Sequence, residues 1–403
     1  MEIVQRRPSR TVEFGIYRDG DNNLDDSQSV LLDQARVVST RNRDVQFTVE
    51  DTTHDGFGKV ASSQWTIQDG TDSVVRNDIR ADDMASPQNL ARFVARTLDN
   101  AQKSDAKQTW IELVDHGAGD GGGLEADSFK QLMPMPAIAQ AIADGVKLHA
   151  QEHPEDAGRK VDGVVANQCL MASLGFADSL SHAGVKYLAA SPETMVSPGV
   201  PSNVADAIAK NADDPQAMGK ALVTDVMQQR YGVGNFGWRP AAAFDMLDLD
   251  PQKRENVENK VKALNDLIAA RVNNKDEISA LRQDATATRG MVRFHDATPD
   301  MPWHADRPAI ALYDRFANDT RLDMQLRDAA KAAEDSVRSL VIAHAESSAF
   351  APFGNADYRD AAGPTVHFPI NAKQIDPWAP RVTETHNRFF DETDAAGAER
   401  VIA

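Results

Sequence analysis

A histidine and the only cysteine of the chain stand at equivalent places after two apolar segments. His116 follows the nearly continuous apolar run 110–114, and Cys169 follows the run 161–166. Such runs predict buried strands of a parallel sheet, whose ligands bind at the carboxyl ends of the strands. If the two strands are neighbours, the side chains meet at one edge, with the imidazole as base and the thiol as nucleophile. The pair therefore predicts catalysis by a thiol.

The glycines after His116 fit two kinds of site. Gly117, Gly119 and Gly122 match G-x-G-x-x-G, the spacing of a dinucleotide-binding loop. That loop needs a helix that begins beside the glycines, whereas helical spacing here resumes only near residue 136. Bare backbone N–H groups beside a histidine also suit an oxyanion hole. The sequence therefore favours an oxyanion site, and a nucleotide-binding α/β enzyme that uses residues 117–123 is an alternative.

Each member of the pair also has a purely structural interpretation. His116 can be a buried histidine at a strand end, and Cys169 can be a small core residue. Two features favour chemistry. The pattern places Cys169 where a strand gives way to a helix, and a helix N-terminus favours the thiolate. The gap of 53 residues, histidine first, is also the order and rough spacing of caspase-type proteases, although their Q-A-C-x-G signature is absent.

An acidic segment follows the first predicted strand. Asp19, Asp21 and Asn23 alternate as calcium ligands do in an EF-hand, but Leu24 and Val30 stand where that loop has Gly and Glu. The alternative is a solvated turn that caps the next helix, since Asp and Asn favour turns. We expect no cofactor to be required, and calcium at Asp19, Asp21 and Asn23 is the one candidate.

Strand and helix patterns alternate along the first 250 residues. Apolar runs predict strands at 12–16, 45–49, 110–114, 161–166, 187–190 and 241–247. Helical spacing occupies the intervals at 29–38, 86–98, 136–150 and 171–180. Repeated strand–helix–strand units predict a mostly parallel sheet with helices on both faces.

The character of the sequence changes after residue 250. Helical spacing predicts a helix from Asp250 onward and another over 322–344, and polar, Pro-rich stretches predict loops at 273–306 and 346–364. One last strand is expected near 365–368. We therefore expect a catalytic domain over 1–250 and a mainly helical C-terminal region over 251–403.

Composition narrows the partners and the location. The 403 residues carry a formal net charge of −18, which argues against nucleic acid or an anionic membrane as the main partner. No apolar run is long enough to span a membrane, and one cysteine cannot form an internal disulfide. The N-terminus lacks the apolar stretch of a secretory signal. We expect a cytoplasmic protein, with export as an effector left open.

Three segments together resemble the clostripain family of cysteine peptidases, family C11. Residues 21–24 resemble its D-N-N-L motif, 114–119 its D-H-G-x-G motif and 167–171 its D-x-C-L-M motif. Weaker similarities occur at 189–193, 244–247 and 363–369. The resemblance implies a caspase-like three-layer α/β sandwich and a cysteine endopeptidase that acts on proteins or peptides.

The resemblance also implies roles for individual residues. Cys169 would attack the scissile carbonyl, His116 would activate the thiol, and the N–H groups of Gly117 and Cys169 would hold the oxyanion. Ser191 and Glu193 stand where the family has a serine and acids that bind substrate.

One position departs from the family pattern. The family has an acid two residues before the nucleophile, on the floor of the pocket for the substrate side chain P1, whereas this chain has Asn167. Burial of Arg or Lys without a carboxylate is costly, so a basic P1 is in doubt unless Glu193 or another acid supplies the charge.

The resemblance also suggests activation by internal cleavage. The polar segment 146–160, between His116 and Cys169, contains Lys147, Arg159 and Lys160 and is the expected processing site. A catalytically inactive relative that serves as a binding or scaffold module remains the main alternative to a peptidase.

Overall fold

The computed structural model describes most of the chain. The described residues are 10–54, 60–78, 82–119, 122–126, 131–195, 197–229, 242–288, 305–347, 361–371 and 388–402. The N-terminal residues that were inspected for a signal sequence lie outside these ranges, as does most of the predicted loop 346–364. No helix of the described part has both the length and the apolar character that crossing a membrane requires.

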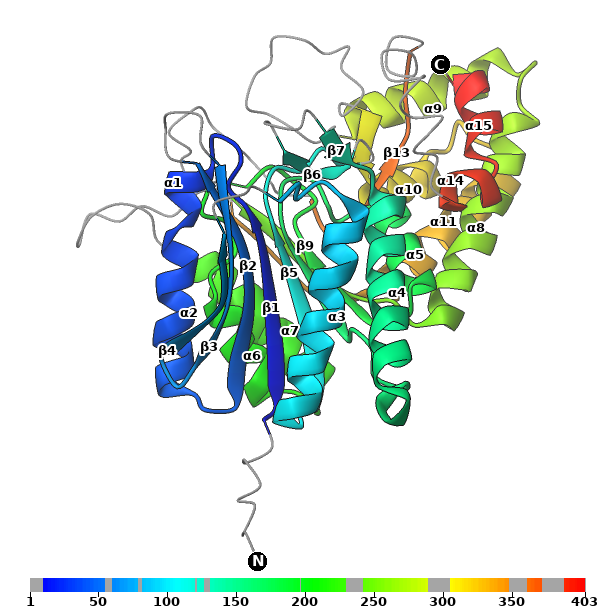
Figure 1. The fold of residues 1–403 in the computed structure, drawn as a ribbon. Coiled ribbons are helices and arrows are strands. Elements are labelled where there is room, and N and C mark those ends of the chain that lie inside the picture. The colour runs from blue at the N-terminus through cyan, green and yellow to red at the C-terminus, as the bar shows by residue number, and fades with distance from the viewer. Residues whose placement is uncertain are drawn as a thin grey trace, which may run out of the picture.

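The centre of the molecule is one nine-stranded sheet with the order β12-β10-β9-β8-β5-β1-β2-β3-β4 (Figure 1). The bounds of its strands are β1 Val12–Asp19, β2 Val45–His54, β3 Val60–Gln68, β4 Thr71–Asp78, β5 Gln108–Val114, β8 Gly163–Asn167, β9 Tyr187–Ala190, β10 Ala242–Asp248 and β12 Val341–Ser347. Two small two-stranded sheets pair β6 (Gly123–Ala126) with β7 (Gln131–Met133) and β11 (Asp306–Pro308) with β13 (Thr365–His367).

The middle of the large sheet is parallel and its margins are antiparallel. Strands β2, β1, β5, β8 and β9 run in one direction. At one margin β3 and β4 form an antiparallel hairpin, and at the other β10 and β12 pair antiparallel. The sequence analysis did not predict the hairpin, because most of its described side chains are half-exposed or exposed, with only Ser62 and Ile67 buried among them, and give no clear apolar run.

Helices cover both faces of the sheet, as predicted (Figure 1). Apolar side chains of α3 (Pro87–Ser104), α4 (Met135–Glu152) and α5 (Leu174–His182) pack on one face. Those of α2 (Val30–Arg41), α6 (Asn203–Lys210) and α7 (Pro215–Gln228) pack on the other. A short helix, α1 (Asp25–Gln28), precedes α2, and a 3-10 turn, η2 (Pro154–Asp156), follows α4. These two cores hold the central strands, and therefore the ends of β5 and β8, in fixed positions.

The C-terminal region forms a third apolar core beside the sheet. Its helices are α8 (Pro251–Ala269), α9 (Lys275–Ala287), α10 (Ala309–Asn318), α11 (Met324–Arg338), α14 (Arg388–Glu392) and α15 (Ala395–Ile402). This region also supplies the edge strand β12, which extends the main sheet. The division of the chain near residue 250 into two domains stays a prediction.

Two predictions for this region were wrong. The interval 273–306, predicted as a loop, contains α9, which begins after Asn274, whose side chain accepts a hydrogen bond from the Glu277 N–H. The helix predicted over 322–344 ends at Arg338, and the chain then forms β12. The apolar residues of 341–347 suit either pattern, and pairing with β10 decides between them. The last strand is present as β13.

Candidate active site

The structure brings the segments that carry His116 and Cys169 together at the carboxyl edge of the sheet. Strands β5 and β8 are parallel neighbours, with Val114 opposite Asn167, so each candidate side chain lies two residues beyond a paired position. The Gln168 Nε2 atom donates to the His116 carbonyl oxygen at 2.9 Å. The prediction that these two strands are neighbours is confirmed.

Gly117 is the point of closest approach between the two segments. A Cβ atom at this position would lie 2.2 Å from the Cys169 carbonyl oxygen and 3.0 Å from its backbone nitrogen. Real carbon atoms do not approach backbone atoms so closely, so only glycine allows the two loops to lie side by side. The peptide groups of Gly117 and Cys169 therefore border one site, as an oxyanion hole requires.

The loop after β1 positions the imidazole. The Nε2 atom of His116 lies 2.7 Å from Oδ1 of Asn23. Asn22 donates to the Asp115 carboxylate at 2.6 Å, and the same carboxylate oxygen accepts the His116 backbone N–H at 2.5 Å. Because an amide oxygen only accepts, this contact is a hydrogen bond when Nε2 of the ring carries the proton, an arrangement in which Nδ1 can act as the base. The D-N-N-L segment thus orients the histidine.

The cysteine occupies a tight turn rather than a helix N-terminus. Leu170, which follows it, has a φ of +65°, a conformation that costs a non-glycine residue energy. Helix α5 begins only at Leu174, after its N-cap Ser173. The prediction that a helix N-terminus activates Cys169 is therefore wrong.

The thiol contacts the backbone of Met195 instead. The Met195 N–H donates to Sγ of Cys169 at 3.2 Å, and Sγ lies 3.7 Å from the Met195 carbonyl oxygen. Burial raises the pKa of the Cys169 thiol; the hydrogen bond from Met195 opposes this shift, and the charge of Glu193 adds to it. The resting thiol is therefore protonated at neutral pH, and a nucleophilic role requires a base.

The described hydrogen bonds include none between the His116 ring and the Cys169 thiol. The ring contacts Asn23 and the thiol contacts Met195. Bonds between base and nucleophile are often long in the absence of substrate and shorten when substrate binds.

The predicted substrate-binding residues after β9 form a buried turn. The Ser191 hydroxyl accepts the Glu193 N–H at 3.0 Å and donates to its carbonyl oxygen at 2.8 Å. The same carbonyl oxygen accepts the Leu170 N–H at 3.0 Å, so this turn supports the loop of Cys169. A role of Ser191 and Glu193 in substrate binding stays a prediction.

Asn167 is buried and its amide is fully engaged. It donates to Oε1 of Glu112 at 2.9 Å and to the carbonyl oxygens of Pro198 and Val200 at 3.2 Å, and its Oδ1 accepts the Val200 N–H at 2.8 Å. It therefore fixes the segment around Pro198 against the end of β8. Its side chain adds no charge to this edge of the sheet.

Glu112, beneath Asn167, makes a pH-dependent contribution to stability. Burial raises the pKa of this carboxyl to about 8, and the hydrogen bond from Asn167 opposes the shift. The folded state thus holds a proton that the unfolded chain releases near pH 4.5, so this contribution to stability falls as pH rises from about 4.5 to 8. We expect Glu112→Gln to match wild type near pH 4.5 and to be more stable near pH 8, by up to about 5 kcal/mol.

Urea unfolding of both proteins across this pH range measures the difference. Glu255→Gln, at an exposed position of α8, is the matched control and should follow wild type at every pH. Parallel curves for wild type and Glu112→Gln would contradict the prediction.

The calcium candidates face different surroundings. Asp19 is fully buried, and burial raises the pKa of its carboxyl to about 8. Its Oδ1 accepts the Asp21 N–H at 2.9 Å, whereas Asn23 is exposed and contacts His116. Calcium binding by Asp19, Asp21 and Asn23 stays a prediction.

The glycine loop has no helix at its end. The Ala118 N–H donates to the Gly122 carbonyl oxygen, and the Gly122 N–H donates to that of Gly119, which closes a turn. The chain then enters β6, and α4 begins only at Met135. Residues 120–121 lie outside the described ranges. Without a helix N-terminus to face a pyrophosphate, this geometry gives the nucleotide alternative no support.

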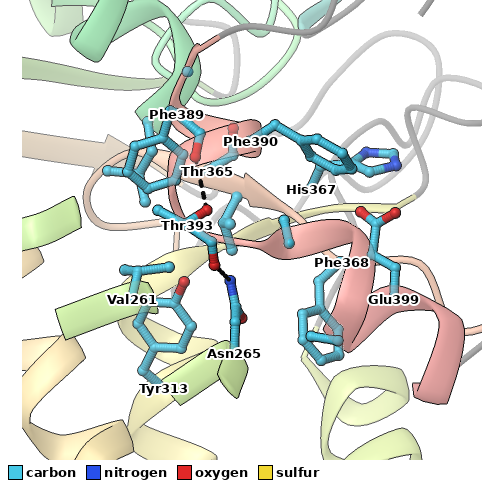
Figure 2. Close-up of a pocket in the computed structure, with 15 residues that line it drawn as sticks. Val261, Asn265, Tyr313, Thr365, His367, Phe368, Phe389, Phe390, Thr393 and Glu399 are labelled. Carbon is cyan, nitrogen blue, oxygen red and sulfur yellow. Dashed lines mark hydrogen bonds between the residues drawn. The ribbon is translucent and has the colours of Figure 1, made fainter. Parts of the chain in front are cut away.

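A small cavity lies in the C-terminal core (Figure 2). It has a volume of about 30 Å³, room for a water molecule but not for a peptide. Asn265 donates to the Thr393 carbonyl oxygen at 3.0 Å, and the Thr393 hydroxyl donates to that of Phe389, so these bonds fasten α14 to α8 (Figure 2). The cavity is therefore part of the packing of the C-terminal helices.

Comparison with solved structures gives whole-chain matches. An inactive zymogen C11 protease from Parabacteroides distasonis matches with a TM-score of 0.64 and 14% identity, over 97% of this chain and 99% of that one. The secreted C11 cysteine protease iotapain from Bacteroides thetaiotaomicron matches with 0.64 and 13%, over 96% and 99%. The chain has the fold of the C11 cysteine proteases. The predicted fold class is confirmed.

One of the matching C11 structures contains a peptide inhibitor. A second structure of the Bacteroides thetaiotaomicron protease, in complex with an irreversible peptide inhibitor, matches with a TM-score of 0.65 and 12% identity, over 96% of this chain and 99% of that one. No protein-family profile matches the sequence, and no curated protein does.

The sequence analysis did not predict the contacts that four residues make at this site. Asn22 and Asn23 were weighed only as a family motif and a calcium ligand, although β1 is the neighbour of β5 and its end lies beside His116. Met195 acts through its backbone, which a sequence cannot reveal. Glu112 gives a clear signal, since it is a lone acid within an apolar strand.

Proposed function

We propose that this protein is a cysteine endopeptidase in which Cys169 is the nucleophile and His116 the base. The observation that carries the proposal is the joining of the two loops at Gly117, where no side chain larger than hydrogen fits. The C11 protease fold supports it, as does the complex of one such protease with a peptide inhibitor.

The geometry supports a sequence of two displacements. Nδ1 of His116 accepts the thiol proton as Sγ attacks the peptide carbonyl, and the N–H groups of Gly117 and Cys169 stabilise the oxyanion. The imidazolium then donates its proton to the leaving amine, which leaves a thioester at Cys169. Water, deprotonated by the same imidazole, attacks the thioester and restores the thiol.

The single cysteine allows a direct test of this proposal. An alkylating reagent can modify only Cys169, so no substitution is needed to address the thiol. We expect the protein to cleave internal bonds of a peptide library and to lose this activity when one alkyl group per chain is incorporated. Absence of cleavage, with an intact fold, would favour a binding or scaffold module instead.

The same library reports specificity. Asn167 is neutral, and Glu112 beneath it is mostly protonated at neutral pH. Neither residue therefore supplies a carboxylate that could pair with a basic side chain of the substrate. We expect peptides with a neutral P1 residue to be cleaved with a kcat/KM about 100-fold above those with Arg or Lys, since a buried unpaired charge costs several kcal/mol.

Glu193→Gln is the matched variant for this prediction. It removes the acid whose charge acts on the thiol and should leave the order of preference unchanged. A preference of wild type for Arg or Lys that Glu193→Gln abolishes would show that Glu193 supplies the missing charge.

We also propose that internal cleavage falls in the exposed turn at residues 157–160. Residues 146–152 of the segment predicted for processing belong to α4. A protease cleft binds its substrate as an extended chain, so a helix is a poor substrate. Arg159 is held by Asp156 and by the Ala106 carbonyl oxygen, whereas Ala157, Gly158 and Lys160 are exposed. The mass of the chain during incubation, compared with that of the alkylated protein, measures this step.

A further inference from the structure

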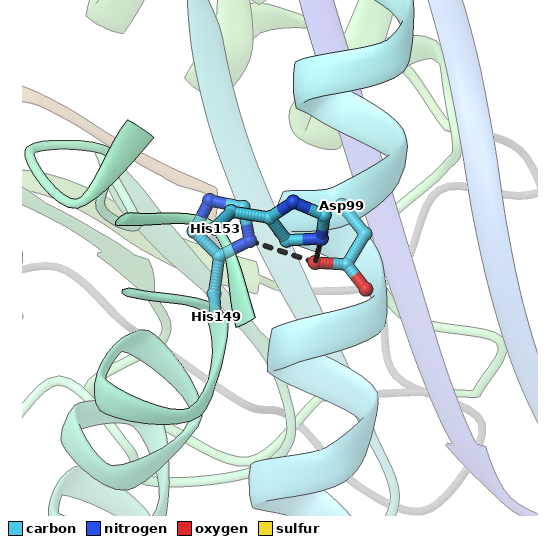
Figure 3. A group of neighbouring side chains, drawn as sticks. All are labelled: Asp99, His149 and His153. Carbon is cyan, nitrogen blue, oxygen red and sulfur yellow. Dashed lines mark hydrogen bonds and ion pairs between the residues drawn. The ribbon is translucent and has the colours of Figure 1, made fainter. Parts of the chain in front are cut away.

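Two histidines and an aspartate meet between α3 and α4 (Figure 3). Asp99 lies near the C-terminal end of α3, and His149 and His153 lie one turn apart at the end of α4. Both helices lead into the amino ends of β5 and β8, whereas Cys169 follows the carboxyl end of β8. We propose that these three side chains bind a zinc ion.

The three ligand atoms all lie within 4.8 Å of one another, close enough for one ion to reach them. Oδ1 of Asp99 lies 2.7 Å from Nδ1 of His149 and 3.4 Å from Nε2 of His153. Donor atoms of tetrahedral zinc lie about 3.4 Å apart, so the separation between Asp99 and His153 already fits and the one between Asp99 and His149 has to open. One oxygen and two imidazole nitrogens suit zinc and not calcium or magnesium, which prefer oxygen. A water molecule would complete the four ligands.

A second shell of carboxylates surrounds the two rings. Nε2 of His149 lies 3.3 Å from Asp156, and Nδ1 of His153 lies 3.4 Å from Glu155. Each ring therefore turns one nitrogen to Asp99 and the other to a second carboxylate. This is the carboxylate–histidine–metal arrangement that orients metal-binding histidines.

Further bonds hold this second shell in place. Asp156 is bound by Arg159, and Glu155 accepts a hydrogen bond from Gln102 of α3 at 2.8 Å. The ion pairs that the structure shows for Asp99 are those with the two histidines, so no Lys or Arg among the described residues occupies the place of the cation.

A similar cluster elsewhere provides the contrast. Asp178, His182 and Glu258 also lie close together, but the Arg254 guanidinium sits among them. It lies 3.1 Å from Asp178 and 3.0 Å from Nε2 of His182, so it already supplies the positive charge and engages the ring nitrogen. In the part of the chain that the structure describes, no Lys or Arg pairs with Asp99 itself, and Arg159 pairs with Asp156 in the second shell.

Zinc titration of four proteins tests the proposal. All carry Cys169→Ala, which removes the thiol as a competing ligand, and the protein with this change alone is the parent. The other three each add one substitution: His153→Ala, Asp156→Asn or the control His182→Ala. After removal of metals by a chelator, we expect the parent and the His182→Ala protein to bind one Zn²⁺ per chain and to gain thermal stability. Co²⁺ should give them the visible absorption of a tetrahedral site.

The variants at the cluster should respond differently. We expect Asp156→Asn to lower the zinc affinity about 10–100-fold, as loss of a second-shell carboxylate does, and His153→Ala to lower it further and to abolish the Co²⁺ spectrum. His153 is partly exposed, so its removal should leave the fold intact, which circular dichroism verifies. Equal zinc binding by the parent and the His153→Ala protein, or none by the parent, would overturn the proposal. Neither result depends on peptidase activity.

Discussion

Replacement of Cys169 by alanine should lower kcat/KM for peptide cleavage by about 10⁴-fold or more, because it removes the atom that forms the acyl-enzyme. Comparable losses follow removal of nucleophiles from other covalent hydrolases, and the remaining rate reflects binding and the oxyanion hole. Initial rates on the best peptide of the library measure the effect. Stability should change little, because the hydrogen bonds that the thiol makes among the described residues are those with the backbone of Met195.

Cys169→Ser separates chemistry from packing. The hydroxyl can keep the hydrogen bond from the Met195 N–H, yet it is a far weaker acid than the thiol, so we expect it to be nearly as inactive as Cys169→Ala. Equal melting temperatures of the three proteins would show that the loss is chemical. Activity above about one tenth of wild type in Cys169→Ala would refute the assignment of the nucleophile.

The sequence predicted the central sheet well because its strands carry the strongest signal. The apolar runs that end before His116 and Cys169 are buried on both faces, and their pattern identifies them without ambiguity. The hairpin of β3 and β4 was missed, and β12 was taken for a helix end. Both lie at the margins of the sheet, where side chains are less buried than in its middle. The apolar pattern is weaker there, so pairing with the adjacent strand decides the structure.

The candidate site was predicted in its parts but not in its electrostatics. The order of motifs placed His116 and Cys169 after neighbouring strands. The expected activation by a helix N-terminus fails because the chain makes a turn at Leu170 and starts α5 four residues later. The groups that act on the thiol instead are the Met195 backbone and the Glu193 charge. The family resemblance pointed to Glu193 only as a substrate-binding residue, and nothing in the sequence links the Met195 backbone to Cys169. Contacts between loops depend on the whole fold, and local patterns do not contain them.

Replacement of His116 by alanine should separate catalysis from the intrinsic reactivity of the thiol. The ring contacts Asn23 and the thiol contacts Met195, so the base is not engaged before substrate binds. We expect His116→Ala to lower kcat/KM for peptides by about 10³–10⁴-fold, the effect of removing a general base of a catalytic set. Its rate of alkylation by iodoacetamide should stay within about threefold of wild type, because burial and not the histidine sets the pKa of the resting thiol.

The pH dependence of alkylation completes this test. Only the thiolate reacts, and burial raises its pKa, so the rate for both proteins should rise about tenfold for each pH unit between pH 6 and 8. Asn23→Ala, at an exposed position that orients the ring, is the matched variant and should lower kcat about tenfold without changing alkylation. Rapid, pH-independent alkylation of wild type that His116→Ala abolishes would show a preformed thiolate–imidazolium pair. That result would mean that the dyad exists before substrate arrives, contrary to the contacts of the resting structure.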